Sequence, residues 1–232
     1  MKKQPGFTLI EIAVVLVIIT GLIGSLLIPV KEYYRQTRIE LTQQRLEEIK
    51  EALLNFAVNN GYLPCPAKDI SGEEADRIPS TTSTDGPICD TYDNSDGYLP
   101  WATLGVGEYY DGWGNPFRYR VDGWFSNSNG IFTPPFSTPQ LLVGSTKEQL
   151  EVKDRQDNLL NVHDDPSFNS NIVAIIFSCG KNAQPEQGIE SITKNNYIQD
   201  VYVENQFDDM LIWVPKYVLI NRLAAAGKWP PK

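Results

Sequence analysis

The feature that most constrains the fold of this 232-residue chain is an apolar run over residues 7–30. Its only ionisable side chain is Glu11. An α-helix rises about 1.5 Å per residue, so about twenty residues cross the ~30 Å hydrocarbon core of a bilayer. The run is long enough to span a membrane. Glu11 then needs a specific role, because a charged side chain in lipid costs at least a few kcal/mol.

The residues on either side of the run bear on how it is used. Lys2 and Lys3 precede it and favour a cytoplasmic N-terminus. A cleaved secretory signal would have a shorter apolar core and a small-residue cleavage site, and residues 25–34, SLLIPVKEYY, offer no such site. An uncleaved signal anchor is the alternative, but it leaves Glu11 without a role.

Residues 1–11, MKKQPGFTLIE, carry a resemblance to a known family. They resemble the class III signal of type IV pilins and type II secretion pseudopilins. The resemblance implies that a prepilin peptidase cuts between Gly6 and Phe7 and that the new N-terminal Phe7 is N-methylated. It also implies that Glu11 pairs with the amine that the cut creates, preferably the amine of a neighbouring subunit. Low dielectric strengthens such a pair, although desolvation offsets part of the gain.

Residues 31–60 are expected to continue the helix as an amphipathic stalk. Apolar residues recur there at helical spacing between charged residues. Asn60-Gly61 favours a helix end, and prolines follow soon after. We expect this stripe to be buried against the rest of the protein, with a separate coiled-coil partner as the alternative. The stripe consists of Ile39, Leu46, Ile49, Leu53 and Phe56.

Residues 61–232 are expected to form a globular head on this stalk, after a leader over 1–6 and a membrane or fibre-core helix over 7–30. Apolar or alternating patterns predict four strands, and a short helix should stop at Gly227. The stretch 111–117, DGWGNPF, is similar to the D-x-W-G-N-P-aromatic stretch of major pseudopilins. The expected class is α+β and pilin-like, with the long N-terminal helix packed on an antiparallel sheet. The predicted strands are 117–121, 171–180, 197–204 and 209–214.

The three cysteines are expected to form one disulfide and one buried free thiol. Residues 61–96 are rich in Ser, Thr, Asp, Gly and Pro, which predicts a long surface loop, and Cys65 and Cys89 lie in it. In the oxidising compartment of an exported head, we expect these two to form a disulfide. A zinc site is the alternative, but the chain has no C-x-x-C and a single histidine. Cys179 ends an apolar run and is expected to be a buried thiol.

Composition and motifs argue against several other functions. A net charge of −9 disfavours nucleic acid as a partner, because that binding depends on Lys and Arg. His163 has no nucleophile motif or ligand set around it, so we expect neither enzymatic activity nor a cofactor. Major pseudopilins bind calcium near the C-terminus, but this chain lacks their Asp-Gly after residues 178–182, SCGKN. Residues 89–97 do not fit an EF-hand, so their acids are expected to be solvated, with no metal site.

The resemblance implies a structural subunit of a type IV pilus or type II secretion filament. Its implied partners are prepilin peptidase, other pilin or pseudopilin subunits, and the bacterial inner membrane before assembly. The head would lie in the periplasm and later in a periplasmic or extracellular filament. A head of about 170 residues is large for this class and favours a minor subunit, and Glu11 disfavours the outermost position. The alternative is a pilus-borne adhesin whose head contacts a surface, glycan or partner protein.

Overall fold

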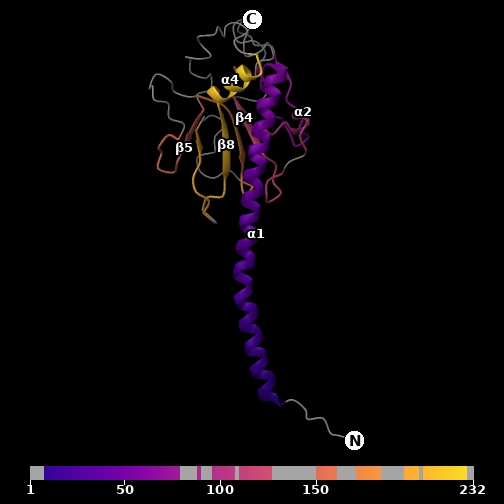
Figure 1. Ribbon diagram of the computed structural model, residues 1–232, viewed down its shortest axis with the longest axis vertical. Coiled ribbons are helices and arrows are strands. Elements are labelled where there is room, and N and C mark those ends of the chain that lie inside the picture. Colours follow the sequence, from indigo (N-terminus) through magenta and orange to yellow (C-terminus); the bar gives the residue numbers. More distant parts are fainter. Residues whose placement is uncertain are drawn as a thin grey trace. The chain divides into compact units, whose positions relative to one another are not determined.

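The computed structural model describes residues 8–78, 88–89, 96–107, 110–126, 150–160, 171–183, 196–203 and 206–228 (Figure 1). Contacts between Cα atoms divide the chain into two compact units, Met1–Glu40 and Leu41–Lys232. The second unit contains every strand of the protein that is described.

The first helix, α1, extends over Leu9–Asn60 without interruption, as the apolar and amphipathic patterns predict. It ends where the Asn-Gly pair favours an end. Gly61 has a φ of +78°, and its N–H donates to the carbonyl of Ala57 at 2.8 Å. Glycine adopts this left-handed conformation without the steric cost that other residues meet, which is why it closes the helix.

The head is built on a four-stranded antiparallel sheet in the order β3-β4-β6-β8. Residues Tyr119 and Ile176 are paired across β4 and β6, and Ile176 is paired in turn with Ile212 of β8. The sheet confirms the α+β class and three of the predicted strands in outline. Its strands are β3 Gly97–Tyr98, β4 Arg118–Val121, β6 Ile172–Ser178 and β8 Met210–Pro215.

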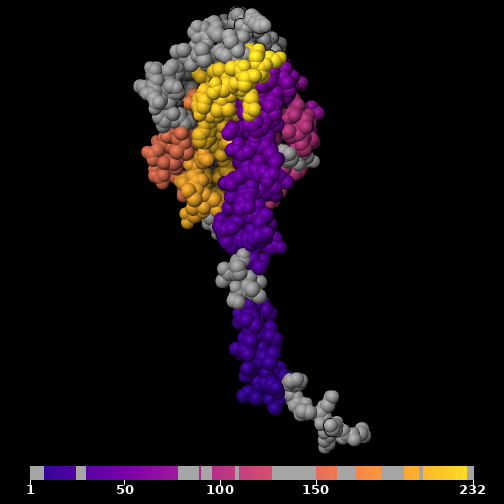
Figure 2. Space-filling model, in the orientation of Figure 1, coloured from indigo at the N-terminus to yellow at the C-terminus, as the bar shows by residue number. Residues whose placement is uncertain are grey.

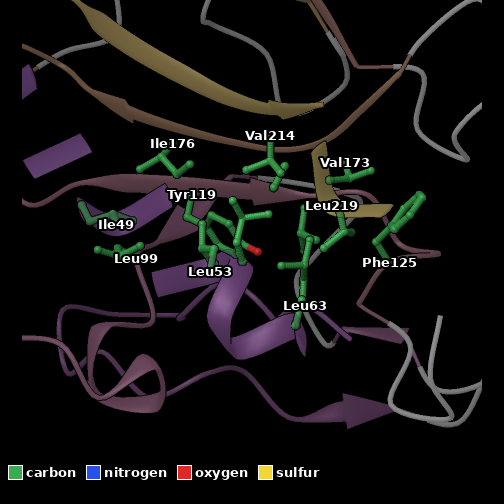
Figure 3. Close-up of a cluster of buried hydrophobic side chains, with 14 of the residues drawn as sticks. Ile49, Leu53, Leu63, Leu99, Tyr119, Phe125, Val173, Ile176, Val214 and Leu219 are labelled. Carbon is green, nitrogen blue, oxygen red and sulfur yellow. The ribbon is translucent and has the colours of Figure 1, made fainter. Parts of the chain in front are cut away.

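One face of this sheet packs on the second half of α1. Leu46, Ile49 and Leu53 are at most 2% exposed and lie in one apolar cluster with Tyr119 and Ile176. Figure 3 shows side chains from the helix and from the sheet meeting in this cluster. The centre of the predicted stripe is therefore a buried face, as expected.

The two ends of the predicted stripe differ from its centre. Ile39 and Phe56 are only partly buried, whereas Leu54 and Ala57 are buried and were not part of the prediction. Phe56 instead packs edge-on against Tyr62, with ring centroids 5.8 Å apart. Near the C-terminal end of the helix, the buried face therefore includes Leu54 and Ala57 and leaves Phe56 at its edge.

A second layer covers the opposite face of the sheet. Strands β5 (Glu151–Lys153) and β7 (Asn196–Ile198) form a parallel pair. Val152 and Tyr197 from this pair cluster with Ile175 and Phe177 of β6. Because both faces of β6 are covered, all seven of its residues are buried, which explains its unbroken apolar sequence.

The strand expected over 197–204 was therefore placed wrongly. It is confined to Asn196–Ile198 and lies in the parallel pair, outside the antiparallel sheet. A short apolar stretch shows that a strand is buried but not which strand it pairs with. The neighbour that decides the pairing, β5, is far away in the sequence.

The remaining elements are short. Helix α4, Lys216–Ala225, follows β8 directly and confirms the predicted C-terminal helix. Figure 2 shows it lying against the end of α1, where Arg222 forms an ion pair with Glu51.

The segment 61–96 is not wholly a surface loop: residues 63–67 are buried, and two short strands pair within it. Those strands are β1 Arg77–Ile78 and β2 Ile88–Cys89, and helix α2 spans Trp101–Leu104.

Candidate functional site

The first unit exposes a helix that is apolar on all sides. Leu9 is 91% exposed, Ile10 73% and Val17 71%, and the other large apolar side chains as far as Ile23 are 44–60% exposed. Since these residues surround the helix, no single buried stripe accounts for them. In the parts of the chain that the structure describes, no helix has the length and apolarity that define a membrane span.

Glu11 lies in the first turn of this helix, beside Thr8. The hydroxyl of Thr8 accepts a hydrogen bond from the backbone N–H of Glu11 at 3.3 Å, and the Thr8 carbonyl accepts from Ile12 at 3.2 Å. Thr8 is therefore the N-cap, and an acid at the third helical position is favourable to the helix dipole. Sequence reasoning missed Thr8, although the Thr-x-x-Glu spacing is a known signal of helix starts. Gly6 and Phe7 lie outside the described residues.

In the second unit, the DGWGNPF stretch forms a turn around Asp111. Its carboxylate Oδ1 accepts hydrogen bonds from the backbone N–H groups of Trp113 at 2.9 Å and Asn115 at 2.8 Å. The Asp111 N–H donates to the Asn115 carbonyl at 2.8 Å and closes the turn. A charged acceptor makes these bonds stronger than neutral ones. The motif is thus a structural turn that depends on its first residue.

This turn connects α1 to the end of β6. The Gly112 N–H donates to Thr42 Oγ1 of α1 at 2.9 Å. On the other side, Ser178 Oγ donates to Asp111 Oδ2 at 2.6 Å. Sequence reasoning missed both partners. Thr42 could have been noticed, because it lies four residues before Leu46 and therefore on the buried stripe.

A buried polar group joins the two layers of the head. The Tyr197 hydroxyl donates to Asp96, and Arg120 Nη1 lies 3.8 Å from Asp96 Oδ1. Burial raises the pKa of Asp96, while the Tyr197 hydrogen bond and the Arg120 charge oppose that rise. The expectation that the acids of residues 89–97 are solvated is wrong for Asp96, because Tyr197 of β7 lies over it. Arg120 beside it is only 3% exposed.

The turn after β6 is packed tightly against the segment that leads into β8. Gly180 has a φ of +55°, and a Cβ there would lie 2.4 Å from the Asp208 carbonyl, so only glycine fits. The Asp208 carboxylate accepts a hydrogen bond from the Lys181 N–H at 2.8 Å. Among the described residues, no three His, Cys, Asp or Glu side chains are grouped so that they could hold a metal ion. His163 and residues 90–95 lie outside the described part of the chain.

The cysteines form one disulfide and one buried thiol. Cys65 and Cys89 are joined with an Sγ–Sγ distance of 2.05 Å. Cys179 is 7% exposed and has no disulfide partner. Burial, followed by the nearby Asp209 carboxylate, raises the pKa of Cys179 to about 12. The thiolate, which is the reactive form, is therefore suppressed at neutral pH.

The head also has a small apolar pocket with a cavity volume of about 10 Å³, which is room for about one water molecule. Aromatic side chains line it, including those of Tyr98, Trp101, Tyr110 and Phe117. Pockets that hold small organic ligands have volumes of about 300–1,000 Å³. This pocket is smaller and has few polar groups to orient a ligand.

Two comparisons with known proteins identify the family. The model of the prokaryotic N-terminal methylation motif matches residues 1–27. The type II secretion system core protein G of Pseudomonas aeruginosa is 31% identical over 123 residues, which cover 53% of this chain and 77% of that protein. No solved structure gives a significant match.

An N-terminal methylation motif on a long helix, followed by an antiparallel sheet that packs on the same helix, defines a pilin-like subunit. The chain belongs to the type IV pilin and type II secretion pseudopilin family.

Proposed function

We propose that this chain is a minor structural subunit of a type IV pilus or type II secretion filament. Prepilin peptidase cuts it between Gly6 and Phe7, and the new N-terminus is methylated. The apolar helix holds the subunit in the inner membrane, with the head in the periplasm, until the helix enters the filament core. The chain acts as a building element and not as an enzyme.

The observation that carries this proposal is the exposed apolar helix with one acid in its first turn. Side chains from Leu9 to Ile23 need an apolar environment on every side, which lipid tails or neighbouring helices supply. Glu11 would be costly in either environment unless a cation neutralises it. The amine that cleavage creates at Phe7 is such a cation, and a neighbouring subunit can present it.

The helix start supports the same pairing. The Thr8 cap places Glu11 in the first turn, so the helix begins immediately after the proposed cleavage site. Glu11 is four residues, about one helical turn, beyond its own proposed N-terminus at Phe7. It can therefore meet the amine of a neighbouring subunit that is displaced by about this length along the filament axis. A pair of this kind sets the register between subunits as well as their charge balance.

The size of the head supports a minor role. Residues 61–232 form a larger head than is usual for the main subunit of such filaments, and a second layer, β5–β7, adds to its bulk. A large head crowds a tightly wound fibre. We therefore expect a copy number well below that of the main subunit, which quantitative mass spectrometry of purified filaments measures.

The experiment that tests the proposal compares Glu11→Gln with Glu40→Gln in the native cell. Both replace an exposed glutamate of α1 by its uncharged isostere, and only the first removes the proposed partner of the amine. We expect both variants to be cleaved normally. Glu11→Gln should be lost from sheared filaments, whereas Glu40→Gln should be incorporated like the parent chain. Incorporation of Glu11→Gln at the parent level would reject the assembly role.

A further inference from the structure

We propose that residues 31–38 of α1, KEYYRQTR, form a binding surface for the phospholipid headgroup layer on the periplasmic side of the bilayer. The inference rests on the proposed membrane-anchored state and adds a specific lipid contact to it. This surface is the 31–38 segment of α1. It would set the depth of the helix in the membrane before assembly.

The position of the 31–38 segment matches the thickness of a bilayer. Twenty residues separate Glu11 from Lys31, and at 1.5 Å per residue they span about 30 Å. The hydrocarbon core of a bilayer has this thickness. When the first turn of α1 lies at one boundary of the core, the 31–38 segment lies at the other.

The two tyrosines of the segment are suited to that boundary. Tyr33 is 68% exposed and Tyr34 62%, with their rings edge-on at 6.0 Å between centroids. Consecutive residues of a helix point about 100° apart, so the pair covers more than one side of it. Tyrosine has an apolar ring and a polar hydroxyl and is enriched where acyl chains meet headgroups.

The charges of the segment complement phospholipid phosphates. Lys31, Arg35 and Arg38 recur at i, i+4 and i+7, which places them on one side of the helix together with Tyr34. Glu32 is the only acid, and Arg35 Nε donates to its Oε2 at 2.8 Å. The segment therefore has a net charge of +2 in a chain of net charge −9. Near an anionic membrane surface, each basic side chain favours binding by about fivefold.

A thiol-labelling experiment on the full chain tests this contact. Val30, 51% exposed, is replaced by cysteine as a reporter at the edge of the apolar run. The native chain gives little background, because Cys65 and Cys89 are joined and Cys179 is buried. The protein is reconstituted into phosphatidylglycerol vesicles, and the rate of reaction with a membrane-impermeant maleimide is measured.

We expect the variant Tyr33→Ser/Tyr34→Ser to raise the labelling rate of the Val30→Cys reporter several-fold, because the rings that would hold this part of the helix at the headgroup boundary are lost. The matched control is Tyr217→Ser, which removes a tyrosine of similar exposure, 57%, from α4 and should leave the rate unchanged. Replacing phosphatidylglycerol by phosphatidylcholine should also raise the rate, because the anionic charge is lost. The inference is overturned if neither the double substitution nor the change of lipid alters the rate.

A second reporter separates failure of this inference from failure of the proposed function. Ile18→Cys lies in the middle of the apolar run and should be protected in vesicles. Gln43→Cys lies on an exposed position of α1 and should react freely. Protection of Ile18→Cys with no effect of the tyrosines rejects the headgroup contact alone. Reaction of Ile18→Cys as fast as Gln43→Cys rejects membrane anchoring, and the inference with it.

Discussion

Ser178 Oγ donates a hydrogen bond to Asp111 Oδ2 at 2.6 Å across 67 residues of sequence, and both residues are buried. The same carboxylate organises the DGWGNPF turn through Trp113 and Asn115. The Asp111 side chain thus stabilises the turn and also binds it to the end of β6. Its loss should weaken both contacts.

We predict that Asp111→Ala lowers the free energy of unfolding by about 3 kcal/mol, because it leaves three hydrogen-bond donors unsatisfied near the core. Asp111→Asn keeps an acceptor and should cost only about 1 kcal/mol. Urea unfolding followed by tryptophan fluorescence measures both. Asp76→Asn, at an exposed position, is the control and should change stability by less than about 0.5 kcal/mol. Equal effects at the two positions would contradict the role given to Asp111.

Thr42 anchors the same turn to α1 through the Gly112 N–H. Thr42→Val removes the hydroxyl with little change of shape and should cost about 1–2 kcal/mol, since it leaves a buried donor without its partner. Thr42→Ser should retain most of the stability. Thr37→Val, on an exposed position of the same helix, should be nearly neutral. A neutral Thr42→Val would show that the turn does not depend on the helix.

The disulfide closes a loop between residues 65 and 89, and the chain-entropy estimate for a loop of this length is about 3.5 kcal/mol. We predict a loss of that size in the variant Cys65→Ala/Cys89→Ala. Adding a reductant should destabilise the parent chain by a similar amount and leave the variant unchanged. A reductant effect that persists in the variant would mean that the stabilisation has another source.

Cys179 should be unreactive in the folded protein because its pKa is raised to about 12. Iodoacetamide at pH 8 should label no thiol before unfolding, one after unfolding, and three after unfolding with reductant. The folded state keeps the thiol proton at pH values where the unfolded state, with a pKa near 9.0, loses it. Stability should therefore fall as the pH rises from about 9 towards 12, and Cys179→Ala should remove this part of the slope. Rapid labelling of the folded chain at pH 8 would contradict the burial.

The elements that sequence reasoning predicts well are those with a local cause. Helix α1 follows from its apolar run, its amphipathic stripe and the Asn-Gly stop, and β6 follows from its unbroken apolar residues. The errors concern contacts between distant segments. Arg120 alternates with apolar residues, which predicts an outward side chain, yet it is 3% exposed. It lies beside Asp96, which accepts a hydrogen bond from Tyr197 of the distant strand β7. The sequence pattern of β4 does not show that β7 lies near it, and the pattern of β7 does not show it either.

The residues singled out above also fall into two groups: those that a local motif indicates and those whose role depends on a distant contact. Gly6, Phe7 and Glu11 are suggested by one short motif, because the proposed processing and assembly depend on residues that are close together in the sequence. Thr42 and Ser178 have no such signal, since each matters only through Asp111 and its turn. A hydroxyl on a buried helix face indicates that a partner exists but does not identify it.

Processing at Gly6-Phe7 and assembly with other pilin-like subunits are what the proposed function requires of this chain. Mild cross-linking in the native cell, followed by mass spectrometry of the purified chain, tests it most directly. We predict a mature N-terminus at a methylated Phe7 and cross-links to other pilin or pseudopilin subunits. A chain that retains residues 1–6 and is cross-linked to no such subunit would contradict the claim.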